Sequence, residues 1–130
     1  MTTELACLVA LAVWGFVLSM VEVTGKTKAA GTEWNAGNRE SEQTFPAWVE
    51  RAGRALGNHK ENFPLFLTAV IVTHLVHRTD SVTAWAAIAY VVLRVAHGVV
   101  YMAGIQKLRS LLFLAGLICV FTIFSRLLTG

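Results

Sequence analysis

Hydrophobic residues are gathered into four segments, each long enough for a helix that crosses a bilayer, which takes about 20 residues. In the second segment only residues 63–76 are strongly apolar. We predict transmembrane helices over residues 5–23, 46–77, 81–105 and 108–128, connected by a polar loop at residues 24–45 and by two very short turns. Short connections place consecutive helices side by side and antiparallel. The expected fold is therefore all-α, with residues 1–130 forming a single integral membrane domain, a four-helix bundle.

Composition also favours a membrane protein. Hydrophobic residues make up 55% of the chain and charged residues only 15%, whereas a soluble domain carries about 25% charged residues. The net charge of +3 is modest, and there is no basic stretch with interleaved aromatic residues, so we expect no nucleic-acid partner. Cys7 and Cys119 lie inside apolar segments and form no paired motif, which indicates packing residues.

Lysine and arginine are distributed unevenly between the two predicted sides of the bilayer. The first and third connections carry Lys26, Lys28, Arg39, Lys107 and Arg109, whereas the opposite side carries Arg78 and Arg126. The positive-inside rule therefore predicts that loops one and three face the cytoplasm. A signal peptide requires basic residues before its apolar segment, and no lysine or arginine precedes the first segment here. We therefore expect a retained transmembrane helix there.

Polar residues form one stripe along the first half of the predicted second helix. Its members, spaced three, four and three residues apart, are Arg51, Arg54, Asn58 and Glu61. At about 100° per residue this spacing puts them on one face. The same argument groups Arg94, His97 and Tyr101 on the third helix. Ionisable residues in a transmembrane bundle are costly and usually face its interior or a water-filled cavity.

The two stripes are expected at the same depth, in the cytoplasmic half of the bundle. If both helices leave a turn at Thr79 and Asp80 with equal rise, Asn58 lies near the height of Tyr101. Cations and a carboxamide facing one cavity favour a ligand with several carboxylates. The alternative is structural: Arg94 and Glu61 would form a buried ion pair that holds the bundle together.

No metal site is expected. The histidines are His59, His74, His77 and His97, and they form neither an HxxxH nor an HExxH pattern. By the same estimate of depth, His74 does not meet His97.

Two stretches resemble the MAPEG family, the membrane-associated proteins of eicosanoid and glutathione metabolism. Residues 50–67 carry the pattern R-A-x-x-N-x-x-E followed by an apolar run, which is similar to the second-helix signature of that family. Residues 94–110, with Arg94, His97, Tyr101 and Arg109, resemble its third-helix region. The closest similarity is to the microsomal glutathione transferase and prostaglandin E synthase branch, and it covers essentially the whole chain.

The resemblance implies a homotrimer with glutathione as co-substrate, bound between neighbouring subunits near the cytoplasmic side. Arg54, Asn58 and Glu61 would bind glutathione, and Arg94, His97 and Tyr101 would line the same site. Arg51 extends this stripe toward the water, and Arg39 would supply a carboxylate clamp from the first loop. Arg109 would be the catalytic residue that stabilises the glutathione thiolate, since cationic neighbours lower a thiol pKa.

The sequence departs from the family pattern at three positions. The spacing between Tyr101 and Arg109 is one residue off the synthase pattern, and Asn62 stands where the leukotriene-forming branch has an aromatic residue. Ser41 stands where the prostaglandin isomerase has an acid, which disfavours that chemistry. A first loop with Asn38 and Arg39 resembles bacterial members, which implies the bacterial inner membrane.

The leading functional prediction is a membrane glutathione transferase or peroxidase acting on lipophilic electrophiles or hydroperoxides. One alternative is a protein that keeps the glutathione pocket without catalysis. Another is a small four-helix transporter. Small multidrug exporters place a carboxylate in the middle of the first helix, whereas here Glu4 and Glu22 lie at its ends, which disfavours export.

Overall fold

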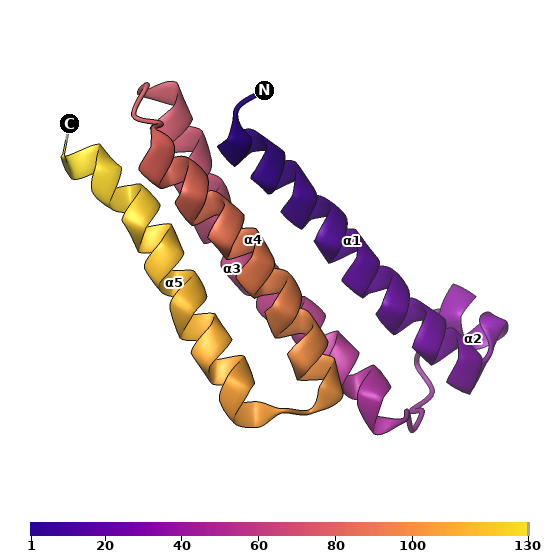
Figure 1. The fold of residues 1–130 in the computed structure, drawn as a ribbon. Helices are drawn as coiled ribbons and strands as arrows, with labels where there is room; N and C mark the ends of the chain where they lie inside the picture. The colour runs from indigo at the N-terminus through magenta and orange to yellow at the C-terminus, as the bar shows by residue number, and fades with distance from the viewer. Residues whose placement is uncertain (130) are drawn as a thin grey trace.

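The computed structural model describes residues 1–129. Its helices are α1 (Thr3–Ala30), α2 (Thr32–Ala36), α3 (Ala47–Leu75), α4 (Ser81–Ala103) and α5 (Gln106–Leu128). The four long helices lie side by side (Figure 1). Helix α1 packs on α3 and α4, and α3 also contacts α5. The expected all-α class is confirmed.

The two ends of the molecule differ in what they carry. Both termini and the α3–α4 turn lie at one end, which we call the terminal end (Figure 1). Helix α2 and the α4–α5 connection lie at the other end, which we call the loop end. Three helices, α1, α4 and α5, are long and apolar enough to cross a membrane. Helix α3 is long enough, but its loop-end half is too polar to be counted with them.

The first connection is more helical than the sequence pattern indicates. Helix α1 continues past Val23 to Ala30, and α2 forms within the predicted loop. The apolar run ends at Val23, but the helix passes through the buried Gly25 and ends only at Gly31. Gly31 has φ of +97°, which other residues rarely adopt, and its N–H donates to the Thr27 carbonyl. The end of α1 is therefore set by the backbone conformation of Gly31 and not by the end of the apolar run.

The α3–α4 connection is longer than predicted, because α3 ends at Leu75 and α4 begins at Ser81. Asp80 caps α4 by accepting from the N–H groups of Val82 and Thr83. The Thr83 hydroxyl accepts in return from the Asp80 N–H, which completes a capping box. At the other end of α4, Gly104 adopts the left-handed conformation with φ of +83°. Both ends of α4 are therefore sharply defined.

A polar network joins three helices at the terminal end. Arg126 of α5 forms an ion pair with Asp80, its Nε lying 2.8 Å from Oδ2. The Thr83 hydroxyl also bonds to the buried carboxylate of Glu4 in α1. Hydrogen bonds from the Thr83 backbone, and then Arg126, hold the pKa of Asp80 below its ordinary value, although partial desolvation opposes them.

This shift predicts acid sensitivity at the terminal end. A depressed folded-state pKa contributes stability that is full above the ordinary aspartate value of about 3.9 and is lost as pH falls through the folded value. The detergent-solubilised protein is therefore expected to lose thermal stability as pH falls below about 4, and Asp80→Asn to lose less over that range. Parallel pH profiles for the two proteins would contradict the assignment.

Close helix packing depends on small residues, as is common in membranes. A Cβ on Gly15 of α1 would lie 2.9 Å from His59 of α3, and one on Gly98 of α4 would lie 2.7 Å from the Trp14 ring of α1. Beyond these crossings, the core contains Phe66 stacked on Tyr90 with ring centroids 4.5 Å apart. These contacts fix α3 and α4 against α1.

Candidate functional site

Two neighbouring cavities open between α3, α4 and the start of α5. The first has a volume of about 260 Å³ and is lined by Arg51, Arg54, Tyr101, Gly104, Ile105, Gln106 and Arg109. The second has a volume of about 410 Å³ and is lined by Asn58, His97, Tyr101, Arg109, Ser110, Phe113 and Leu114. Tyr101 and Arg109 belong to both, so they form the wall between the two cavities.

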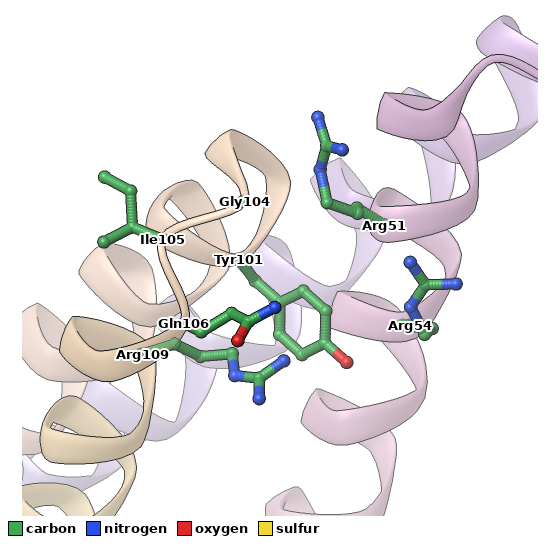
Figure 2. Close-up of a pocket in the computed structure, with 7 residues that line it drawn as sticks. All are labelled: Arg51, Arg54, Tyr101, Gly104, Ile105, Gln106 and Arg109. Carbon is green, nitrogen blue, oxygen red and sulfur yellow. The ribbon is translucent and has the colours of Figure 1, made fainter.

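The first cavity is strongly cationic. Three guanidinium groups line it, from Arg51 and Arg54 on α3 and from Arg109 on α5, and none of the described residues in its lining is acidic. Figure 2 shows the side chains of Arg51 and Arg54 on α3 on one side of the space, and those of Tyr101 and Arg109 on the other. Arg51 also donates from Nε to the Met102 carbonyl at 2.7 Å, which ties α3 to the last turn of α4. The cavity is therefore suited to carboxylates.

The wall between the cavities is held by a cation–π contact. The Arg109 guanidinium lies 4.6 Å from the centre of the Tyr101 ring. Tyr101 in turn makes an edge-to-face contact with His97, with ring centres 5.7 Å apart. Arg109 reaches this position because Gly104 turns the chain sharply and α5 begins at once. Its charge is thus fixed where a ligand spanning both cavities would pass.

Behind the second cavity lies a buried arginine. Arg94 is only 3% exposed, and its Nη2 donates to Asn58 Oδ1 at 2.8 Å. Asn58 itself lines the second cavity, and with its oxygen bound to Arg94 its amide N–H groups remain to donate to a ligand. His97 is 2% exposed, and its Nδ1 has no hydrogen-bond partner among residues 1–129. A buried polar atom without a partner is costly, which suits a ligand-binding position.

The predicted structural alternative, an ion pair between Arg94 and Glu61, is wrong for a single chain. The ion pairs among the described residues are Lys26–Glu22 and Arg126–Asp80. Arg94 bonds to Asn58 instead, and Glu61 is exposed on the outside of α3. The reason is angular, since Glu61 lies about 60° further from the α4 side than Asn58 does.

Most of the predicted binding residues gather between the middle of the bundle and the loop end. Arg51, Arg54, Asn58, His97, Tyr101 and Arg109 line one or both cavities, and Arg94 supports Asn58 from behind. Asn58, predicted near the height of Tyr101, lines the second cavity together with it and also accepts a hydrogen bond from Arg94.

Arg39 is not brought to either cavity. Its Nε donates to the Asn35 carbonyl at 3.1 Å, and its guanidinium lies 5.5 Å from the centre of the Trp34 ring. Both contacts belong to α2 and the loop after it. Within one chain, Arg39 therefore stabilises the first loop.

Sequence reasoning missed Ser110, Phe113 and Leu114 on α5 and Gln106 at its start. Helical spacing could have indicated two of these residues, since Ser110 follows Arg109 and Phe113 lies one turn further along the same helix. Gln106 could not have been found from spacing, because its position depends on the tight turn at Gly104.

The order and spacing of these residues along the chain can be compared with those of known protein families. The chain matches the MAPEG family profile over residues 5–129, nearly its whole length. It belongs to the MAPEG family. No individual curated protein matches it. Family members include glutathione transferases and related membrane proteins, some of them without enzymatic activity.

Proposed function

We propose that this MAPEG protein is a glutathione-dependent transferase or peroxidase acting on lipophilic electrophiles or hydroperoxides. The observation that carries the proposal is a cavity lined by three guanidinium groups and no acid, joined through Arg109 to a second, more apolar cavity. Membership of a family that includes glutathione transferases supports it.

The chemistry of glutathione matches the described side chains. Glutathione carries two carboxylates, one ammonium and one thiol. The arginines of the first cavity suit the carboxylates, and the Asn58 amide adds a donor. Glu61 lies one helical turn beyond Asn58 on α3 and is the proposed acceptor for the ammonium.

Arg109 is the proposed catalytic residue. A thiol held against its guanidinium is stabilised as the thiolate, since electropositive surroundings lower a thiol pKa from about 8.5 toward neutrality. The thiolate then attacks an electrophilic carbon, forming a C–S bond while the leaving group departs with the displaced electron pair. With a hydroperoxide, the thiolate attacks the terminal oxygen and releases an alcohol. A second glutathione then reduces the sulfenic acid to the disulfide and water.

Access from the bilayer supports lipophilic substrates. Leu114 lines the second cavity and also an apolar groove of about 670 Å³ that follows the outer face of α5 past Ile118 and Phe121. Since α5 is apolar enough to cross a membrane, an acyl chain lying in this groove would bring its reactive end to Arg109.

The proposed assembly is a homotrimer in a bacterial inner membrane, with the loop end facing the cytoplasm. Arg54 and Glu61 are exposed on α3 of a single chain, and charged side chains are rarely presented to lipid. If α3 is the fourth crossing, these residues need cover from neighbouring copies. A neighbour would also allow Arg39 to reach a site that its own chain does not offer it.

The proposal predicts a glutathione thiolate that depends on Arg109. Adding glutathione to detergent-solubilised protein near neutral pH should produce the ultraviolet thiolate absorbance, and Arg109→Ala should abolish it. Turnover of a generic electrophile such as chlorodinitrobenzene should fall by about 100-fold or more in that variant, as for the loss of one stabilising group.

Lys107→Ala is the matched control, because Lys107 is an exposed cation two residues away that lines neither cavity. Its thiolate signal and turnover should stay close to those of the unmodified protein. Absence of a thiolate signal in the unmodified protein, or its persistence in Arg109→Ala, would refute the proposed mechanism. A thiolate signal without turnover would indicate a glutathione-binding protein that is not an enzyme.

A further inference from the structure

Lys60 lies in the middle of the bundle yet faces outward. It is exposed on α3, and its neighbours in sequence fix its height. His59 packs on Gly15 of α1, and Asn58 bonds to Arg94 of α4. Gly15 and Arg94 lie close to the midpoints of the apolar part of α1 and of α4. Lys60 is therefore near the centre of the membrane-spanning region.

A lysine at this depth needs a counter-charge. A charged side chain at the centre of a transmembrane helix is costly even by the lowest scale. Lys60 takes part in neither ion pair found within residues 1–129. The acid at the same height is Glu61, which is also exposed. The two cannot meet within one helix, because consecutive side chains point about 100° apart.

Their directions fit a ring of identical helices. The buried face of α3 contains Ala55, His59 and Phe66. On the opposite face, at about 100° per residue, Lys60 and Glu61 fall on the two flanks with Gly57 and Pro64 between them. In a rotational assembly about an axis along the membrane normal, one flank of each copy meets the other flank of the next. The height difference between the two residues is only about 1.5 Å.

We propose that α3 of one chain packs against α3 of the next copy, with the Lys60 ammonium of one paired to the Glu61 carboxylate of the other. Each copy contributes one cation and one anion, so the ring is neutral at the bilayer centre. A carboxylate has two oxygens, and Glu61 can accept from this lysine and from a ligand ammonium together. The inference rests on the self-association proposed above and not on glutathione chemistry.

Disulfide crosslinking tests the contact directly. Cys7 and Cys119 are first replaced by alanine, and differently tagged chains carrying Lys60→Cys or Glu61→Cys are co-expressed. Mild oxidation should crosslink the two kinds of chain to each other, with several-fold less product when either variant is expressed alone. Equal crosslinking of Lys60→Cys with itself would indicate a two-fold contact and overturn the proposal, as would the absence of crosslinks.

Charge reversal tests the energy of the pair. Lys60→Glu and Glu61→Lys should each raise the concentration at which the assembly dissociates in detergent by tenfold or more, and the double variant should restore it. Lys107→Glu, an equal change of charge on α5, should leave the molar mass from light scattering unchanged. If the double variant dissociated at the same concentration as the single variants, the pairing would be refuted. The thiolate signal reports separately on the proposed function, so either proposal can fail alone.

Discussion

Replacing Arg94 with methionine is expected to stabilise the ligand-free protein while weakening glutathione binding by about ten- to a hundredfold. Arg94 is 3% exposed, and its one side-chain partner among the described residues is the Asn58 amide oxygen. A buried charge without an opposite charge is costly, and replacing buried ionic groups with apolar ones of similar volume often stabilises by about 1–4 kcal/mol. Methionine keeps the volume and removes the charge.

The loss of affinity has a different cause. Arg94 holds the Asn58 side chain by its amide oxygen at the wall of the second cavity, which leaves the amide N–H groups to donate to the ligand. A hydrogen bond to a charged group contributes about 1.5–3 kcal/mol, and each 1.4 kcal/mol is a tenfold change in affinity. Without Arg94, Asn58 can rotate, and the positive field behind the ligand carboxylates disappears.

Thermal unfolding and calorimetric titration of glutathione measure the two effects on one preparation. Asn58→Leu is the matched control, because it leaves the Arg94 guanidinium buried without a partner. That variant should lose both stability and affinity. If Arg94→Met lowered stability as much as Asn58→Leu does, Arg94 would be a structural residue and its link to the ligand would be wrong.

Introducing leucine at Gly98 is expected to destabilise the protein by about 3 kcal/mol, near the upper range for inserting a large side chain into a packed site. A Cβ at this position would already lie 2.7 Å from Cζ2 of Trp14, and an indole ring cannot move aside as a flexible chain does. Leucine is a good helix former, so the loss would come from the crossing of α1 and α4. Chemical or thermal unfolding in detergent measures it.

Val99→Leu provides the same new side chain one residue further along α4, on an exposed surface. It should change stability by less than about 0.5 kcal/mol. Trp14→Ala combined with Gly98→Leu should cost less than the sum of the single changes, because the leucine then occupies the space of the ring. Additive effects in the double variant would show that the two residues do not meet.

The sequence by itself determined the helical, membrane-embedded class and most of the cationic site. Long apolar runs can satisfy their backbone groups in a bilayer only as helices or closed barrels. The spacing of Arg54 and Asn58 puts them on one helix face whatever surrounds the helix. The pattern at residues 54–61 also carried the family relationship that the profile match confirms.

Only the tertiary structure decided which of these residues meet. Arg94 bonds to Asn58 and not to Glu61, because helix rotation and the longer α3–α4 turn fix the register between α3 and α4. Arg39 is held by α2, a short helix that hydrophobicity did not reveal. Gly104 turns the chain so that Arg109 stacks on Tyr101 between the two cavities. Periodicity fixes the direction of a side chain about its own helix, but its partner depends on how whole helices pack, which no local pattern records.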